Sequence, residues 1–409
     1  MALTTALRVF VPFALGYFLS YVFRVVNAVI APDLVGELHL DAGALGLLTS
    51  TYFLTFAAFQ LPLGILLDRF GPRRTESVLL LVAAAGAFVF ALAPNAGTLV
   101  IGRGLIGIGV SACLMAAFKA FVQWFPAGRL PLINGLEMAV GGIGALAATV
   151  PVEAALTITD WRGVFWGLGA LTIAAAVLLY LMVPERDDGP APHSTFRQQV
   201  GGVVQVMTSP VFWRVAPATF TTQASFLAVQ SLWAGPWLRD IAGYDRAGVA
   251  NGLLIIAVAM MVGFIFAGAV AERLGRLGIK PVAVAMVAMN TSIVLQAVIV
   301  LELPVPPLVI WSAFALFGTS GILVYAGLSQ TFPKHLAGRV NTSINLLVFV
   351  ASFLFQWGVG VVIGLWPATE SGGYRPEAYQ AGFGAVLAVQ VIAMLWLVFF
   401  RRAPLPLKA

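Results

Sequence analysis

The sequence predicts an all-α integral membrane protein with twelve transmembrane helices in two bundles of six. Of its 409 residues, 60% are hydrophobic and only 10% are charged, whereas soluble domains are about 45–50% apolar and about 25% charged. The apolar residues also form long blocks, many of them longer than the ~18 residues that a spanning helix needs. The blocks lack alternation with period two, and backbone groups in hydrocarbon must bond within their own segment, so we expect helices rather than barrel strands.

Charged residues, prolines and glycines divide the apolar blocks into twelve spans. The first six are 7–30, 43–66, 76–94, 98–122, 131–155 and 162–183. The other six are 211–237, 247–270, 280–301, 307–329, 341–365 and 379–400. The polar stretch between the sixth and seventh spans predicts an N-terminal bundle at 1–186, a cytoplasmic linker loop at 187–210 and a C-terminal bundle at 211–409.

The 23 lysines and arginines are distributed unevenly between the two faces that twelve crossings imply. Most of those outside the spans lie on the face that holds both termini. The opposite face holds only Arg162, Arg239, Arg246 and Arg375. The positive-inside rule therefore predicts that both termini are cytoplasmic, and we expect a multi-pass protein of a bacterial inner membrane. The net charge of +6 then reflects topology, so no nucleic-acid partner is expected.

A short motif occurs twice, once after the second span and once after the eighth. Its residues are Gly64, Asp68, Arg69, Gly71 and Arg73 in the first copy, and Gly268, Glu272, Arg273 and Gly275 in the second. The spacing G-x-x-x-D/E-R-x-G is the same in both copies. A further pattern, R-x-x-x-G-x-G, begins at Arg103 in the fourth span. The repeat indicates that the two halves are related to each other.

With these motifs the chain resembles the major facilitator superfamily over all twelve spans. The resemblance implies a monomeric secondary transporter that works by alternating access. It also implies that Asp68 meets the N-terminus of the eleventh helix near Asn341 when the cytoplasmic side closes, and that Glu272 meets the fifth helix near Leu132. Simple positive-inside anchoring is the alternative for the arginines of the loops. The glycines at 135–144 match the antiporter pattern of the family poorly, so antiport is not supported.

Two arginines, Arg24 and Arg103, lie inside spans, where a charge costs about 2.5 kcal/mol or more. The resemblance implies that helices 1, 4, 7 and 10 line a central cavity, which would bring both guanidinium groups to one anion site. Tyr17, Tyr21, Arg24 and Asn27 recur at three and four residues and make a polar face on the first helix. The alternative for Arg103 is a structural strut that bonds backbone carbonyls of that helix.

The second half offers neutral polar and aromatic groups in place of buried charges. They are Gln223 and Gln230 in the seventh span, Trp311 and Tyr325 in the tenth, and Asn345 in the eleventh. We expect these residues to complete the binding site for the solute. Hydrogen bonding between helices is the alternative for each of them.

Coupling to an ion is predicted from one buried carboxyl group. The three histidines lie outside the spans, so a proton carrier has to be a carboxylate, and Glu137 in the fifth span is the candidate. Lys119 in the fourth span is an alternative partner that would make Glu137 one half of an ion pair. H⁺ and Na⁺ both stay open as the coupling ion, as does facilitated diffusion.

These features predict a secondary transporter, acting by symport, of a small, anionic organic solute. Efflux of a larger amphiphilic metabolite or drug is the alternative, which the aromatic residues favour. An enzyme is not expected, because neither H-E-x-x-H nor G-x-S-x-G occurs in the chain. No catalytic residues, metal ligands or cofactor are predicted.

Overall fold

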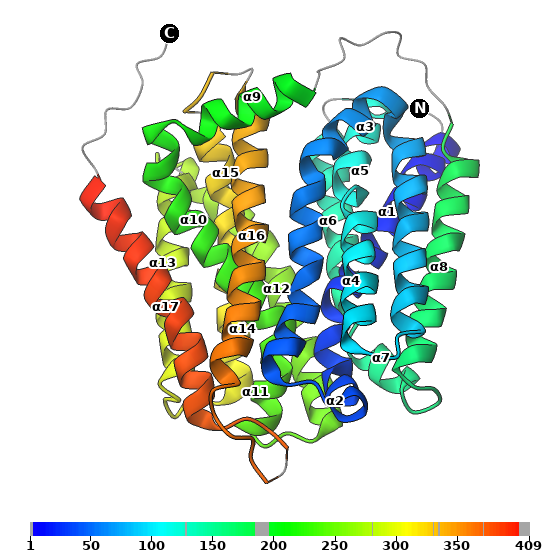
Figure 1. Ribbon diagram of the computed structural model, residues 1–409. Coiled ribbons are helices and arrows are strands. Elements are labelled where there is room, and N and C mark those ends of the chain that lie inside the picture. The colour runs from blue at the N-terminus through cyan, green and yellow to red at the C-terminus, as the bar shows by residue number, and fades with distance from the viewer. Residues whose placement is uncertain are drawn as a thin grey trace. The chain divides into compact units, whose positions relative to one another are not determined.

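The computed structural model describes residues 3–126, 129–184, 196–279, 281–329, 331–333, 336–370 and 372–400. Within these residues the regular secondary structure is entirely helical (Figure 1). The first half contains α1 (Leu3–Val25), α2 (Asn27–Leu38), α3 (Ala42–Ala91), α4 (Ala96–Val110), α5 (Cys113–Trp124), α6 (Leu130–Ala147), α7 (Val150–Ala155) and α8 (Trp161–Met182).

The second half begins with an amphipathic helix and continues with helices that are interrupted in two places. It contains α9 (Phe196–Met207), α10 (Pro210–Ala228), the π-helical segment η2 (Val229–Trp233), α11 (Ala234–Asp240), α12 (Arg246–Gly275), α13 (Pro281–Val300), α14 (Pro307–Gly318), the 3-10 segment η3 (Thr319–Gly321), α15 (Ile322–Ser329), α16 (Ala337–Ile363) and α17 (Pro376–Phe399).

Among the described residues, 10 helical stretches are long and apolar enough to cross a membrane. One of them, α3, is 50 residues long and contains both the second and the third predicted spans. The predicted seventh span is divided into α10, η2 and α11, and it is not among the ten. The ten stretches therefore hold eleven of the predicted spans, and the divided seventh span completes the twelve that the sequence predicts.

The turn inside α3 depends on one glycine. Gly71 has φ 75° and ψ 168°, a conformation that a side chain with a Cβ atom rarely adopts. Pro72 follows, and the Thr75 hydroxyl donates a hydrogen bond to the Leu66 carbonyl at 3.0 Å. The chain thus passes from the second span to the third in a tight turn, and the third span begins earlier than residue 76.

Three predicted spans of the first half contain breaks that the hydropathy pattern does not reveal. The first is divided between α1 and α2, the fourth between α4 and α5, and the fifth between α6 and α7. At the break in the fourth span the Ser111 hydroxyl donates to the Ile108 carbonyl at 2.6 Å. Serine hydroxyls that bond the preceding turn compete with the backbone and bend helices.

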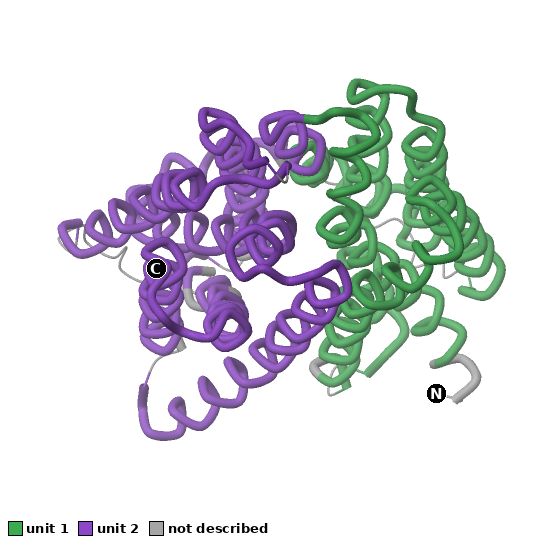
Figure 2. Tube along the Cα trace, turned by 90° about the horizontal axis from the view of Figure 1, so that it is seen from below, with its two compact units in different colours: residues 1–40, 51–196 green, residues 41–50, 197–409 purple. Residues whose placement is uncertain are grey.

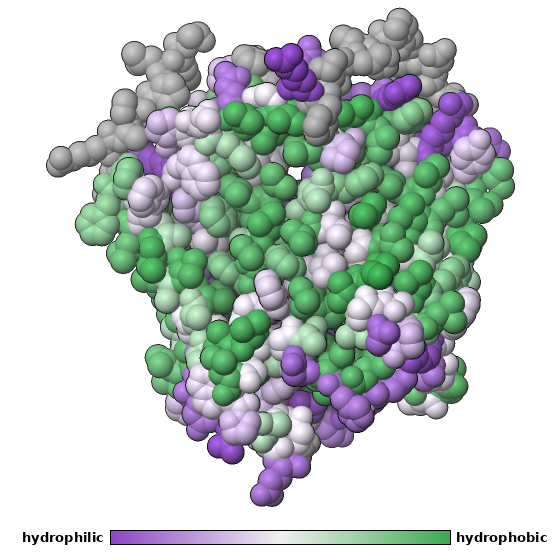
Figure 3. All heavy atoms as spheres, in the orientation of Figure 1, coloured by the Kyte–Doolittle hydropathy of each residue, from purple (hydrophilic) through white to green (hydrophobic). Residues whose placement is uncertain are grey.

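Large apolar side chains lie exposed on the outer faces of the helices. Leu181, Ile265, Val287 and Ile392 are 73%, 67%, 70% and 66% exposed. Figure 3 shows hydrophobic residues covering the helical faces, with hydrophilic residues gathered near the helix ends. Apolar exposure on this scale is unfavourable in water and favourable in lipid. The protein is therefore a multi-pass membrane protein.

The chain divides into two compact units, coloured separately in Figure 2. The first unit comprises residues 1–40 and 51–196, and the second comprises residues 41–50 and 197–409. Residues 41–50 belong to the second unit because the start of α3 packs on α16. Gly46 lies against the backbone of Gln356 and Trp357, and Gly360 lies against the carbonyl of Ala42.

The prediction of a linker loop at 187–210 is wrong for residues 196–207, which form α9. Val203 and Val206 of this helix are buried, and Val206 belongs to a hydrophobic core with Phe212, Val340 and Ile344. The apolar residues at spacings of three make the segment amphipathic, so it packs as a helix of the second unit. Residues 187–195 of the predicted linker lie outside the described residues.

Candidate functional site

Arg24 lies in the first unit, at the end of α1, and is surrounded by aromatic rings. Its side chain is buried, with 9% exposure. The guanidinium carbon lies 4.5 Å from the ring centre of Tyr21, 5.8 Å from that of Phe56 and 5.9 Å from that of Tyr52. The negative faces of such rings attract a cation. This setting stabilises the charge of a planar group whose donor geometry suits carboxylate or phosphate.

Arg103 of α4 lies beside the end of α1 and bonds its backbone. The side chain is 1% exposed, and it donates to the Phe23 carbonyl at 2.5 Å and to the Arg24 carbonyl at 3.4 Å. Its guanidinium also lies 4.9 Å from the ring centre of Tyr52. The last carbonyls of a helix lack donors within the helix. Where α1 ends at Val25, Arg103 provides hydrogen-bond donors to two of them. This is the strut arrangement that the sequence left open.

The other predicted residues of α1 lie within the bundle. Tyr17, Tyr21 and Asn27 are 4%, 8% and 0% exposed. The rings of Tyr17 and Tyr21 pack edge to face with their centres 5.2 Å apart, and the Tyr17 hydroxyl lies 3.5 Å from the Met138 sulfur of α6. The predicted polar face of α1 is therefore directed partly toward α6.

Glycines of α6 allow α1 to approach closely. A Cβ atom on Gly141 would lie 2.9 Å from the Tyr21 ring, and one on Gly144 would collide with the Phe18 carbonyl. A larger residue at either position would force the helices apart. These glycines fix the position of Tyr17 and Tyr21 on α1.

Glu137 of α6 is fully buried in the first unit, and within the described chain neither of its carboxyl oxygens has a hydrogen-bond partner. Lys119, the alternative partner considered for it, instead donates to Asp68 at 2.7 Å and to the Leu67 carbonyl at 2.8 Å. Lys119 therefore pairs with Asp68 in this structure and not with Glu137.

Glu76 of α3 is a second buried carboxyl group, and the sequence analysis missed it. It is 0% exposed, and among the described residues the only donor near its two oxygens is the thiol of Cys113, which is a weak one. The carboxyl group occupies the space beside Gly16 of α1, where a Cβ atom would collide with it. The third span was predicted to begin at this residue, and the sequence analysis assigned it no role.

Three of the residues predicted in the second half converge within the second unit. The Tyr325 hydroxyl of α15 lies 3.4 Å from Oε1 of Gln223 on α10 and 3.5 Å from Oδ1 of Asn345 on α16. Gln230 lies in the π-helical segment η2 and is 4% exposed. A π-bulge inside a helix often occurs at a functional site.

Trp311 of α14 belongs to the core of the second unit. It is 0% exposed, and its ring centre lies 5.5 Å from that of Trp237, 6.0 Å from that of Phe314 and 6.5 Å from that of Phe383. Aromatic rings that meet edge to face in this way stabilise packing. We therefore assign Trp311 to the hydrophobic core.

The first copy of the loop motif is bonded within the first unit. Asp68 accepts from Lys119, as described above, and Arg73 donates through Nε to the Tyr180 carbonyl at 2.8 Å. The Arg73 guanidinium also lies 4.6 Å from the Tyr180 ring centre. Gly64, at the start of the motif, is half-buried in α3. These contacts fix the turn between the second and third spans.

The second copy of the motif is more exposed. Glu272 accepts from Arg276 at 2.6 Å one helical turn later, and the two side chains are 70% and 77% exposed. Arg273 is also exposed. The corresponding arginine of the first copy, Arg69, has its guanidinium 5.3 Å from the ring centre of Phe70. The predicted gating contacts of Asp68 and Glu272 with helix N-termini stay predictions.

An ion pair that the sequence analysis missed joins α2 to α8. Glu37 accepts hydrogen bonds from the Trp161 indole and the Arg162 guanidinium, both at 2.6 Å. These two donors lower the pKa of the Glu37 carboxyl below its usual range. Arg162 also donates to the Ala91 and Ala93 carbonyls at 3.0 Å and 2.8 Å. This cluster closes one end of the first unit.

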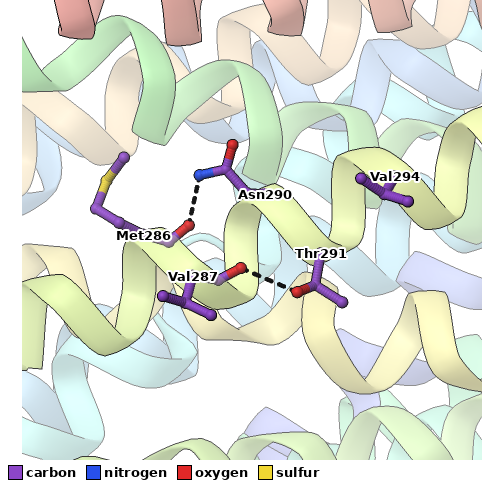
Figure 4. A pocket seen from close by; sticks show the side chains of 5 residues that line it. All are labelled: Met286, Val287, Asn290, Thr291 and Val294. Carbon is purple, nitrogen blue, oxygen red and sulfur yellow. Dashed lines mark hydrogen bonds between the residues drawn. The ribbon is translucent and has the colours of Figure 1, made fainter.

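A pocket on the outer surface of α13 is shown in Figure 4 and lined by Met286, Val287, Asn290, Thr291 and Val294. Asn290 donates to the Met286 carbonyl at 2.7 Å, and Thr291 donates to the Val287 carbonyl at 3.0 Å. Val287 and Val294 are 70% and 62% exposed. All five residues belong to α13, and the two polar side chains bond the backbone of that helix. This pocket is therefore a shallow groove on the exposed apolar surface of α13.

Comparison with known proteins agrees with the fold and with transport. The chain is 25% identical to the probable sulfoacetate transporter SauU of Cupriavidus necator over 94% of its own length and 91% of that protein. It is 26% identical to the hexuronate transporter of Escherichia coli K12 over 58% of each chain. It is also 28% identical to the nitrate/nitrite transporter NrtP of Nostoc punctiforme over 50% of this chain and 42% of that one.

Solved transporter structures share the fold. A bacterial homologue of the human lysosomal transporter Spinster, in an inward-facing and occupied conformation, matches with a TM-score of 0.77 and 17% identity. The match covers 99% of this chain and 98% of that one. The sequence pattern of the Major Facilitator Superfamily matches residues 13–356 of this chain. The protein therefore belongs to the Major Facilitator Superfamily and is a membrane transporter, not an enzyme.

Proposed function

We propose that this transporter carries a small organic anion by alternating access and that Arg24 anchors the anionic group. The observation that supports this proposal is the buried guanidinium of Arg24 among three aromatic rings of α1 and α3. A buried cation is costly to maintain in a membrane protein, and such residues mark the paths of solutes. Arginine also matches carboxylate, sulfonate and phosphate groups with paired donors.

The relatives support an anionic solute through the substrates in their names. Sulfoacetate, hexuronate and nitrate all carry negative charge, although their sizes differ. An arginine anchor is compatible with each of these anionic groups. The hydrogen-bonding groups around the anchor would then distinguish one anion from another.

Arg103 has a positioning role in this proposal, and Arg24 is the direct contact. The donors of Arg103 are directed at the carbonyls of Phe23 and Arg24, so the side chain holds the end of α1 that carries Arg24. In the second unit, Tyr325, Gln223 and Asn345 offer neutral donors and acceptors for the uncharged part of a solute.

Transport is proposed to be coupled to protons, with Glu137 as a carrier. Its carboxyl group is buried, and protonation would remove a charge that the apolar surroundings disfavour. We further propose a monomer in a bacterial inner membrane with both termini in the cytoplasm, as the distribution of basic residues indicates. The motif residues Asp68 and Glu272 are proposed to act in gating.

Uptake into proteoliposomes tests the anion anchor. Purified protein is reconstituted, and uptake of radiolabelled sulfoacetate, glucuronate and nitrate is compared for the wild type, Arg24→Ala and Arg24→Lys. We expect uptake of one anion by the wild type, loss of uptake in Arg24→Ala and partial recovery in Arg24→Lys. The exposed Arg375→Ala is the matched control. Undiminished uptake by Arg24→Ala would contradict the role of Arg24.

Efflux of a larger amphiphilic compound is the second candidate, and the same protein can be tested for it. The aromatic residues of the second half favoured this function, but Trp311 lies in the packed core. Ethidium export from cells that express the protein, together with no uptake of the three anions, would favour efflux over our proposal.

A further inference from the structure

Two buried carboxyl groups lie in the first unit without a partner that balances them. Glu76 of α3 and Glu137 of α6 are both 0% exposed. Glu137 has no hydrogen-bond partner among the described residues, and the only donor near the Glu76 oxygens in those residues is the Cys113 thiol, which is a weak one. Buried polar groups in proteins are nearly always hydrogen-bonded, so a pair of this kind requires an explanation.

The two carboxyl groups share their surroundings. The Glu76 carboxyl occupies the space beside Gly16 of α1. The hydroxyl of Tyr17, the next residue of α1, lies 3.5 Å from the sulfur of Met138, which follows Glu137 on α6. The buried thiol of Cys113 on α5 lies near both carboxyl groups. The carboxyl groups therefore form one cluster at the meeting of α1, α3, α5 and α6.

No basic residue of these four helices neutralises the pair in the part of the chain that is described. The basic residues on them are Arg8, Arg24, Arg69, Arg73, Arg74 and Lys119. Lys119 bonds Asp68, Arg73 bonds the Tyr180 carbonyl, and Arg24 lies among aromatic rings. Tyr17 and Cys113 are titratable neighbours of the pair, and neither carries a positive charge in either protonation state.

Two ionised carboxylates in an apolar bundle are costly, because each loses its hydration and repels the other. A bound cation removes this cost, and a proton does so with the fewest contacts. A calcium ion would need about six oxygen ligands or more, and the described ranges hold no group of three His, Cys, Asp or Glu side chains that could bind a metal ion. A proton needs only one carboxylate oxygen, so we take the proton as the bound cation.

We propose that Glu76 and Glu137 together form a two-carboxyl proton-binding site and that Glu76 is a full member of it. Each step is a simple acid–base exchange, in which a carboxylate takes one proton from water to become a carboxylic acid and later returns it. The proposal rests on the transport function given above, and it adds Glu76 to the coupling machinery. Protonation removes the repulsion between the two groups and lets α3 and α6 stay packed on α1.

Helix α1 connects this cluster to the anion anchor. Gly16 and Tyr17 lie beside the carboxyl groups, and Arg24 lies eight residues beyond Gly16 on the same helix, about 12 Å along its axis. The Tyr17 and Tyr21 rings fill the interval and pack against each other. A change in the protonation of the carboxyl pair therefore changes the electrostatic environment of α1, the helix that carries the anion anchor Arg24.

Infrared difference spectroscopy tests protonation of the pair without any transport measurement. The wild type, Glu76→Gln, Glu137→Gln and the double variant are compared at neutral pH in water and in deuterium oxide. We expect a carboxylic-acid band that shifts in deuterium oxide and is weaker in either single variant than in the wild type. Glu377→Gln, which alters an exposed carboxylate at the start of α17, should leave the band unchanged. A band of equal intensity in the wild type and the double variant would overturn the proposal.

Transport in proteoliposomes then tests coupling, with sulfoacetate as the probe. A pH gradient of one unit supports at most about tenfold accumulation for each proton carried with the solute. We expect Glu76→Gln to lose accumulation driven by this gradient but to keep counterflow exchange at equal pH, and we expect the same of Glu137→Gln. Glu76→Asp should restore part of the accumulation. Full accumulation by Glu76→Gln would overturn its role in coupling.

The two tests separate failure of this inference from failure of the proposed function. Lack of sulfoacetate counterflow in the wild type would count against that solute, whereas the infrared band would still report on the carboxyl pair. Because glutamine keeps the shape of glutamate and removes a buried charge, the variants are expected to fold. Size-exclusion chromatography of each purified variant checks this expectation.

Discussion

Substitution of Arg103 separates a structural role from a direct role in solute binding. The side chain holds two carbonyls at the end of α1, and one of them belongs to Arg24. Because that contact involves the Arg24 backbone, replacing the Arg24 side chain leaves it in place. We therefore expect Arg103→Ala to lower stability and to keep solute binding, and Arg24→Ala to lose solute binding.

The magnitude follows from the contacts of Arg103. A hydrogen bond from a charged donor contributes about 1.5–3 kcal/mol, and the bond to Phe23, at 2.5 Å, is the stronger of the two. The stacking on Tyr52 adds about 1 kcal/mol or more. Removal of the guanidinium also ends the cost of burying a charge. We expect Arg103→Ala to lose about 3 kcal/mol of unfolding free energy.

Thermal unfolding of the purified protein in detergent, with and without the transported anion, is the measurement. Arg103→Ala should unfold at a lower temperature than the wild type yet keep the upward shift that the solute produces. A solute at a hundred times its Kd stabilises by about 2.7 kcal/mol. Arg24→Ala, which removes contacts with three rings, should also unfold at a lower temperature than the wild type, but it should lose the solute-induced shift.

Arg162→Ala provides the matched control. This guanidinium also donates to two backbone carbonyls, but its side chain is 27% exposed. Water can replace much of what is lost there, so the expected cost is about 1 kcal/mol. Unchanged stability of Arg103→Ala together with loss of the solute-induced shift would refute the structural role and make Arg103 a direct contact.

Three further predictions concern packing, backbone conformation and pH. Gly144→Val should lower the unfolding temperature through a cost of about 1–3 kcal/mol, whereas Gly135→Val, where no atom lies within 4 Å of the added Cβ, should not; equal effects would contradict the close approach of α1. Gly71→Ala should cost about 1 kcal/mol because the residue has φ 75°, and wild-type stability would contradict this conformation. The pKa of Glu37 is lower in the folded protein than in the unfolded chain. The Glu37 carboxylate therefore gives its full stabilisation of the fold above the unfolded-state pKa, and this stabilisation is lost as the pH falls through the folded-state pKa. Melting temperatures across acidic pH should therefore fall less in Glu37→Gln than in the wild type; its exposed pairing with Arg162 limits the effect to about 1 kcal/mol, and parallel curves would count against it.

The helical fold followed from the sequence because long apolar blocks leave few other structures in lipid. Breaks inside those blocks were harder to foresee. The break at Ser111 depends on one hydroxyl that bonds the preceding turn, and many serines in transmembrane helices do so without interrupting them. Helix α9 was taken as a loop because the segment is polar, although its valines at spacings of three could have indicated an amphipathic helix.

The candidate site was harder to predict, because hydropathy does not show which way an apolar helix faces. Trp311 was expected to line a cavity, whereas it packs against three other aromatic side chains of the core. Arg24 and Arg103 lie at similar depth and are chemically identical. Only the geometry separates an arginine surrounded by rings from one that bonds the backbone of α1.

Glu76 shows how a charged residue beside a loop can be misjudged. A charge at the edge of an apolar block is usually solvated, because helix ends lie near water. Here the turn at Gly71 is tight and α3 continues through Pro72, so Glu76 already lies a full turn inside the helix. Gly16 of α1 then provides the room that its carboxyl group occupies. Where two spans are joined by so short a turn, a carboxylate four or five residues past the glycine should be counted as buried, and a buried carboxylate in a transporter predicts a role in coupling.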